Sequence, residues 1–93
     1  MTKSMNDFPK PIKVKIFYEE ELKKITKKNS EEAVVSEGLK FVQFLSFVFT
    51  SYPEIQKNYP PGKLGLLLND RRPQDSDTLK DGDEVTLKYV AEL

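Results

Sequence analysis

The sequence predicts an α+β domain in which four short strands form a mixed sheet and one main helix packs on one face of that sheet. Two observations predict this class. Apolar and polar residues alternate near both ends of the chain, as in half-buried strands, and an apolar stripe with helical spacing lies between these segments. The chain has 93 residues, the length of one small domain, so these elements must share a single core.

The N-terminal half is expected to contain a hairpin. Residues 1–11 are polar and end in two closely spaced prolines, so we expect a flexible tail there and a single domain over residues 12–93. The first strand is expected at residues 12–18, and a second strand at residues 32–36 is expected to pair back on it. The inward face of the first strand would carry Ile12, Val14, Ile16 and Tyr18.

A highly charged segment, residues 19–30, joins these two strands. It contains Leu22 and Ile25, two apolar residues that are three positions apart. This spacing predicts one helical turn held by the two side chains and followed by a solvated loop.

Residues 39–52 form the main predicted helix. Its apolar residues fall on one stripe at about 100° per residue, Ser36 is expected to cap its N-terminus, and Pro53 is expected to end it. Phe47 lies on the opposite, polar side, and two interpretations stay open: the loop at residues 53–62 folds over it, or it is an exposed contact point. The stripe consists of Phe41, Phe44, Leu45, Val48 and Tyr52.

Two further strands are expected in the C-terminal half. A surface loop at residues 54–63 would lead into a third strand at residues 64–68. A tight connector would then place Leu79 in the core, and residues 84–90 would form the last strand. The inward face of that strand would carry Val85, Leu87 and Tyr89.

The order of these elements is β-β-α-β-β. The helix has to return the chain to the sheet through a right-handed crossover, with its apolar stripe buried on one sheet face. In this arrangement the first and last strands lie parallel in the centre of the sheet. The predicted fold is therefore a ubiquitin-like β-grasp.

The composition favours a carrier or binding module over an enzyme. The chain contains no cysteine and no histidine, which removes thiolate nucleophiles, the commonest general base and the commonest metal ligands. Acidic residues near the C-terminus do not follow the spacing of a calcium loop, so we expect no metal site and no cofactor. Fifteen basic and fifteen acidic residues cancel, so an RNA-associated module is the weakest alternative and no nucleic-acid partner is expected.

The N-terminus has no apolar signal region, and the longest apolar stretch is too short for a membrane span. A cytoplasmic protein without a membrane partner is therefore expected. This expectation depends on the missing signal alone, because the absence of cysteine is compatible with any compartment.

The second half of the chain resembles the MoaD/ThiS sulfur carriers, with the greatest similarity to the small subunit of molybdopterin synthase. The resemblance is carried by Tyr52-Pro53-Glu54, the Asn69-Asp70-Arg71-Arg72 turn, Asp77-Thr78-Leu79 and Lys80-Asp81-Gly82-Asp83-Glu84-Val85. It implies a protein without its own active site, whose C-terminal carboxylate is adenylated by a partner enzyme and converted to a thiocarboxylate. A larger synthase subunit would then receive the sulfur for molybdopterin synthesis.

The last residues depart from the family pattern. Carriers of this family end in Gly-Gly, which suits a tail that threads a narrow channel, whereas Glu92 and Leu93 stand at these positions here. The terminus at Leu93 would be the reacting group only if the carrier interpretation holds. Two alternatives stay open: the natural protein continues or is altered here, or the chain is a non-catalytic β-grasp module that binds other proteins through its open sheet face.

That open face is the predicted partner-binding site. The outward sides of the two central strands should place Lys13, Lys15 and Phe17 beside Lys88 and Val90, with Leu67 joining from the third strand. The face would be basic at one end and apolar at the end where the chain leaves the sheet. An ordinary solvated face is an equally weighted interpretation. Arg71 and Arg72 form a further candidate contact for an anion or a partner carboxylate, although a solvated turn explains them as well.

Overall fold

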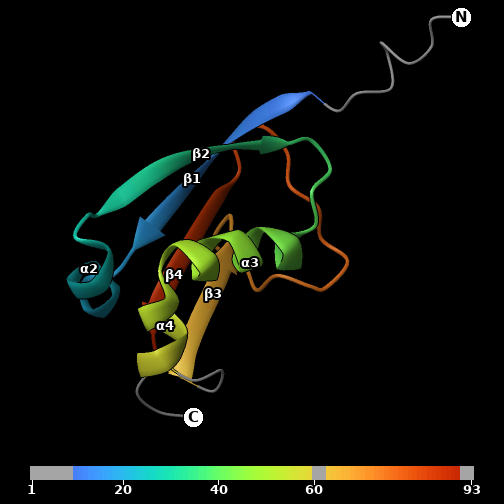
Figure 1. Ribbon diagram of the computed structural model, residues 1–93. Helices are drawn as coiled ribbons and strands as arrows, with labels where there is room; N and C mark the ends of the chain where they lie inside the picture. Colours follow the sequence, from blue (N-terminus) through green and yellow to red (C-terminus); the bar gives the residue numbers. More distant parts are fainter. Residues whose placement is uncertain (1–9, 60–62, 91–93) are drawn as a thin grey trace, which may run out of the picture.

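The structure is a computed structural model in which residues 10–59 and 63–90 are described. A hairpin, a main helix followed by a shorter one, and two more strands succeed one another along the chain (Figure 1). The elements are β1 (Pro11–Tyr18), α2 (Glu20–Thr26), β2 (Ser30–Ser36), α3 (Phe41–Ser51), α4 (Pro53–Asn58), β3 (Leu64–Leu68) and β4 (Glu84–Tyr89).

The four strands form one mixed sheet in the order β2-β1-β4-β3. The strand pairs β1–β2 and β3–β4 are antiparallel, and the two central strands β1 and β4 are parallel, with Ile16 opposite Val85. This is the predicted arrangement, in which the first and last strands meet in the centre. The ubiquitin-like β-grasp fold is confirmed.

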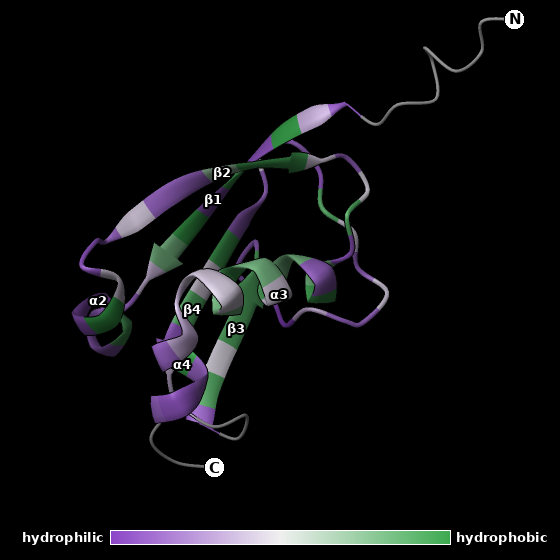
Figure 2. Ribbon diagram, viewed as in Figure 1, coloured by the Kyte–Doolittle hydropathy of each residue, from purple (hydrophilic) through white to green (hydrophobic). Residues whose placement is uncertain are grey.

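Alternation along the strands places the core on one face of the sheet. In β1 the even-numbered residues from Ile12 to Tyr18 are buried, as predicted, and Figure 2 shows the change between hydrophobic and hydrophilic residues along this strand. The helix α3 covers this buried face with part of its predicted stripe. The other buried apolar side chains of the core are Leu22, Phe41, Phe44, Val48, Ile55, Leu68, Leu79, Val85 and Leu87.

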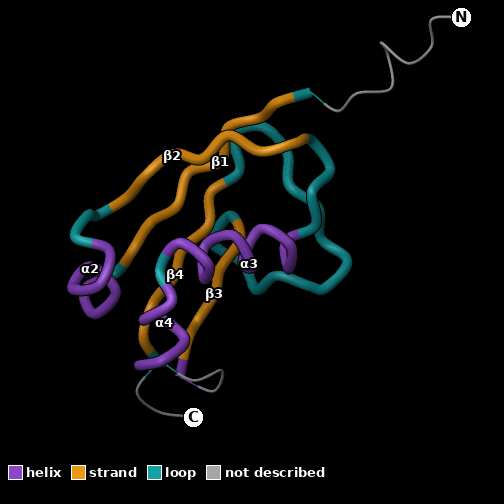
Figure 3. Tube along the Cα trace, viewed as in Figure 1, coloured by secondary structure: helices purple, strands orange, loops and turns teal. Residues whose placement is uncertain are grey.

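The long connection between β3 and β4 passes the start of α3 (Figure 3). There the Phe41 N–H donates to the Asp77 carbonyl at 2.9 Å, and the Leu79 N–H donates to the Leu39 carbonyl at 2.8 Å. These bonds satisfy backbone groups at the helix entry and hold the predicted core residue Leu79 fully buried.

The expected surface loop at residues 54–63 is wrong over its first half, and residues 60–62 lie outside the described residues. Residues Pro53–Asn58 form the helix α4, and Ile55 is buried in the core. Pro53 ends α3 as predicted, but it also opens α4, because a proline at the first helical position loses no hydrogen bond. Glu54 in the first turn and Lys57 in the last turn complement the helix dipole.

Two smaller expectations also fail, and one of the two interpretations of Phe47 is excluded. Ser36 ends β2 and does not cap α3, whose N-cap is Lys40 with its N–H bonded to the Gln43 side chain at 3.1 Å. Tyr89, the last residue of β4, is 40% exposed although its ring packs on that of Tyr59, with centroids 5.3 Å apart. Phe47 is 58% exposed, so the interpretation in which a loop covers it is wrong.

Two expectations concern the ends of the chain. The predicted tail at residues 1–11 lies outside the described residues, except for Lys10 and for Pro11, where β1 begins. Within residues 10–59 and 63–90, no helix is long and apolar enough to cross a membrane.

Candidate functional site

The face of the sheet opposite α3 is the predicted partner-binding site. Its outward side chains form cross-strand rows that the register defines. Phe17 lies opposite Thr86 in the parallel pair, and Thr86 lies opposite Leu67 in the antiparallel pair. The structure therefore brings Phe17 and Leu67 to one row across three strands, with a threonine between them.

The apolar end of this face continues toward the C-terminal side of β4. Lys88 lies opposite Gly65, and the Val90 N–H donates to the Lys63 carbonyl at 2.8 Å. A Cβ atom at Gly65 would lie only 2.7 Å from Val90 Cγ2 and 3.1 Å from Lys88 Cγ. Glycine at this position thus allows Val90 and the Lys88 stem to lie flat on β3. Phe17, Leu67 and Val90 are all half-buried.

The basic end is less basic than the sequence suggested. Lys13 and Lys15 are exposed on β1, but Lys15 lies between Glu32 of β2 and Glu84 of β4. Cross-strand pairs of opposite charge attract at this spacing. The Lys15 ammonium also lies 5.4 Å from the centroid of the Phe17 ring, within the range of a cation–π contact.

An open hollow of about 580 Å³ lies beside this row. Its rim carries Glu19, Glu20, Asp70 and Glu84 against a single lysine, Lys23, so acidic groups predominate around it. These acidic neighbours could not be predicted from the sequence, because they come from three separate segments that only the strand register and the α2 position bring together.

The two arginines of the turn after β3 behave differently. The guanidinium of Arg71 forms a bidentate pair with Asp77, with Nη1–Oδ2 and Nη2–Oδ1 distances of 3.1 and 3.3 Å. The bonds from Arg71 and from the Gln74 N–H lower the pKa of the Asp77 carboxyl, and the bond to Asp77 raises the pKa of Arg71. Arg71 is therefore already engaged within the connection to β4, while Arg72 is exposed in the same turn.

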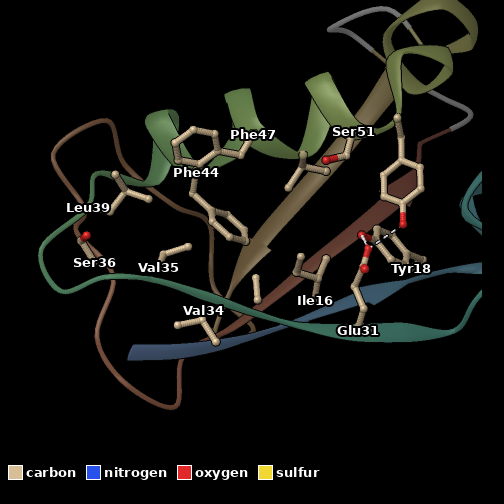
Figure 4. A pocket seen from close by; sticks show the side chains of 13 residues that line it. Ile16, Tyr18, Glu31, Val34, Val35, Ser36, Leu39, Phe44, Phe47 and Ser51 are labelled. Atoms are coloured by element: carbon tan, nitrogen blue, oxygen red, sulfur yellow. Dashed lines mark hydrogen bonds between the residues drawn. The ribbon is translucent and has the colours of Figure 1, made fainter. Parts of the chain in front are cut away.

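A second surface feature lies on the helix side of the sheet. An apolar groove of about 450 Å³ runs between the edge strand β2 and α3 (Figure 4). Phe44 and Phe47 line it from the helix, and Val35 lines it from the strand. Of the residues that line it, the sequence marked only Phe47 as a possible exposed contact, while Phe44 belongs to the predicted apolar stripe.

One end of the groove is closed by a polar cluster around Glu31. The Tyr18 hydroxyl and the Tyr52 hydroxyl both donate to Oε2 of Glu31, the latter at 2.8 Å, and the Lys28 ammonium lies 3.2 Å from Oε1. Burial, followed by the bond to Glu31, raises the pKa of Tyr18. Burial alone would raise the pKa of Glu31, but the bonds from the two tyrosines and Lys28 outweigh it and lower that pKa.

The predicted reacting terminus, Leu93, and its neighbour Glu92 lie outside the described residues. Within the parts of the chain that are described, no group of three or more acidic side chains is arranged to hold a metal ion. The arrangement found there consists of two surface features of different character, the open sheet face and the apolar groove beside α3.

Comparison with solved structures shows what the chain is similar to. A Pyrococcus furiosus protein provisionally described as molybdopterin converting factor, subunit 1, superposes with a TM-score of 0.75 at 19% identity, over 86% of this chain and 99% of that one. Small archaeal modifier protein 1 from Haloferax volcanii gives 0.72 at 12% identity, over 86% and 99% of the two chains. The protein of the same name from Methanosarcina acetivorans gives 0.69 at 16% identity, over 88% and 96%.

These similarities cover nearly the whole length of each relative and support the resemblance drawn from the sequence at the level of the fold. No family model matches the sequence, and no curated protein matches it either. At these identities the shared property is the ubiquitin-like β-grasp fold.

Proposed function

We propose that this ubiquitin-like chain is a carrier of the sulfur-carrier or protein-modifier type, without an active site of its own. It acts in the cytoplasm and docks on protein partners through the open face of its sheet. The observation that carries the proposal is three half-buried apolar side chains along that face, here named the apolar cluster: Phe17 and Leu67 in one cross-strand row, and Val90 four residues after Thr86 of that row. Apolar side chains gathered on an uncovered sheet face are typical of a surface that another protein covers.

The position of this cluster supports a role in presenting the end of the chain. The central strand β4 runs through the middle of the face, and Val90 follows it directly on the apolar side. A partner that covers the apolar cluster is therefore placed beside the point where the chain continues beyond residue 90. A partner enzyme can supply the cysteine and histidine side chains that this chain lacks.

The resemblance to MoaD/ThiS carriers indicates which partners to test. They are an adenylating enzyme, which would activate the terminal carboxylate, and a larger synthase subunit, which would receive the sulfur for molybdopterin. The mixed charges around Lys15, Lys88 and Glu84 would fix the orientation of such a partner more than its affinity. The engaged Arg71 leaves Arg72 as the available contact of the predicted pair.

Replacing Phe17 by aspartate is expected to weaken binding to either partner by at least about tenfold, since a charge would be buried in the centre of the interface. Val90→Asp is expected to act in the same way. The dissociation constants would be measured by calorimetry with the adenylating enzyme and the large synthase subunit of the same organism. Because Phe17 and Val90 are half-buried, circular dichroism and urea unfolding would establish that both variants stay folded.

Val42→Asp is the matched control, because Val42 is 43% exposed on α3, on the other side of the sheet. It should bind both partners as the original chain does. Equal affinities for Phe17→Asp and the unaltered protein would exclude the open face as the docking site.

The chemistry of the terminus has a separate test, the intact mass of the protein isolated from its own cells. A form that ends in Gly-Gly, or a mass gain of one sulfur-for-oxygen exchange in the protein as isolated from these cells, is the result expected of a carrier. A mass that corresponds to Leu93 as the terminus, with no adduct, would instead support a non-catalytic interaction module. The carrier and the non-catalytic module would both dock through the open face. The mass measurement therefore does not affect the test with Phe17→Asp and Val90→Asp.

A further inference from the structure

A small apolar hollow lies on the helix side of the sheet, at the edge that β3 forms. Its volume is about 170 Å³, and its lining consists of Phe49, Gln56, Tyr59, Leu64 and Leu66. Sites for small molecules are larger, at roughly 300–1,000 Å³. Water gains few hydrogen bonds against a mainly apolar lining. The hollow therefore suits one apolar side chain better than a ligand or a group of water molecules.

The hollow lies beside the end of β4. In the sheet register Leu64 lies opposite Tyr89, and the Val90 N–H donates to the Lys63 carbonyl at 2.8 Å. The Tyr89 ring packs on the ring of Tyr59, with centroids 5.3 Å apart. The end of β4 thus runs past two residues that form the wall of the hollow.

The residues that follow Val90 offer one side chain of the right kind. Ala91 is small and Glu92 is charged, whereas Leu93 is a large aliphatic residue. Leu93 itself lies outside the described residues. In β4 the odd-numbered side chains lie on the helix side of the sheet, and continuation of this alternation assigns residue 93 to the same side.

The chain is long enough for Leu93 to reach the hollow. Leu93 follows Val90 by three residues, and three extended residues span about 10 Å. Val90 is bonded to residue 63, which directly precedes Leu64 in the wall of the hollow. The occupant is also tethered to the domain at Val90, so it is present at a high effective concentration.

We propose that the Leu93 side chain packs in this hollow, against Phe49, Tyr59 and Leu64, and so holds the end of the chain on the helix side of the domain. Covering these apolar walls and the leucine together is favourable, because both leave water. The packing itself does not depend on the proposed function. Its consequence for a carrier does: a partner on the open face would have to displace Leu93 before it reached the end of the chain.

Methyl NMR of the full chain is the direct test. A methyl group held over an aromatic ring resonates upfield of its ordinary position. Both Leu93 methyl signals are therefore expected upfield, with nuclear Overhauser contacts to the rings of Phe49 and Tyr59. Leu93→Ala, which removes the two signals, assigns them. Phe49→Leu keeps an apolar wall but removes one ring, so it should reduce the upfield shift.

The melting temperature gives a second measurement. Leu93→Ser is expected to lower it by roughly 4 to 8 °C, the shift for the loss of one partly buried apolar side chain from a domain of this length. Glu92→Ser is the matched control, because alternation assigns its side chain to the other side of the chain. It should leave the melting temperature unchanged.

Three outcomes would overturn the proposal. They are Leu93 methyl signals at their ordinary positions without contacts to the two rings, equal melting temperatures for Leu93→Ser and the original chain, and ring contacts from Pro60 or Pro61 instead of Leu93. The last result would mean that the segment before β3 fills the hollow. A failure of both partners to bind the open face would leave the Leu93 signals as expected, so failure of the proposed function is distinguishable from failure of this inference.

Discussion

Replacing Ile55 by alanine is expected to lower the free energy of unfolding by about 3 kcal/mol. Ile55 is fully buried although it belongs to the six-residue helix α4. Its side chain joins the same core as Leu22 of α2, and α4 contacts both α2 and α3. Alanine would leave a cavity under a helix too short to be stable without this anchor.

For a domain of this size, about 3 kcal/mol is a large share of a total stability of roughly 5 to 15 kcal/mol. The melting temperature should therefore fall by more than about 10 °C. Urea unfolding followed by circular dichroism measures the change. Gln56→Ala, at the exposed neighbouring position of the same helix, should change stability by less than about 0.5 kcal/mol. A loss below about 1 kcal/mol in Ile55→Ala would mean that α4 does not hold the core together.

This helix also shows where local sequence patterns fail. Residues 53–59 contain one aliphatic residue, Ile55, and are followed by two prolines and a glycine. One buried side chain produces no periodicity, and the adjacent Pro60-Pro61-Gly62 favours a loop prediction. The strands were predictable for the opposite reason. In β1, four buried residues repeat with period two, so the signal is redundant and the loss of one residue would not hide it.

The burial of two side chains was predicted wrongly for one physical reason. Whether a side chain is buried depends on the other elements that cover it. Tyr89 continues the inward alternation of β4, yet it is exposed and packs on Tyr59 at the end of the sheet. Phe47 stays uncovered, because the segment expected to fold over it forms α4 instead. Neither outcome can be derived from the residue itself or its nearest neighbours in the sequence.

The candidate sites show the same contrast between features that local sequence patterns predict and features that only the tertiary structure determines. Alternation was enough to place Phe17, Leu67 and Val90 on one face, since it requires only that each strand exists. The acidic partners of Lys15 were missed, because Glu32 and Glu84 meet it only through the register of two strand pairs. A shift of that register by one residue would move them to the other face. The β2–α3 groove depends on the placement of a helix over an edge strand, which no local pattern specifies.

Glu31→Ala is expected to cost about 2 to 3 kcal/mol of unfolding free energy, because a charged acceptor of several hydrogen bonds is lost. The carboxylate joins β2 to Tyr18 of β1 and to Tyr52, which lies between α3 and α4. Without it, the almost fully buried Tyr18 side chain keeps a hydroxyl that has lost its acceptor. Glu32→Ala is the matched control, since Glu32 is the exposed neighbour on the same strand and should change stability by less than about 0.5 kcal/mol.

The same cluster predicts how stability depends on pH. The hydrogen bonds from Tyr18, Tyr52 and Lys28 hold the pKa of Glu31 below its ordinary value in spite of its partial burial. A carboxyl whose pKa is lower in the folded state contributes stability above its unfolded pKa of about 4.3, and this contribution is lost as the pH falls through the folded pKa.

Glu31→Gln keeps an acceptor oxygen but cannot titrate. The difference in unfolding free energy between the original chain and Glu31→Gln should therefore be constant from about pH 7 to pH 6 and shrink below about pH 4.3. A difference that stayed constant down to pH values near 3 would mean that the charge of Glu31 does not contribute to the tyrosine cluster, and that its oxygen atoms act only as neutral acceptors.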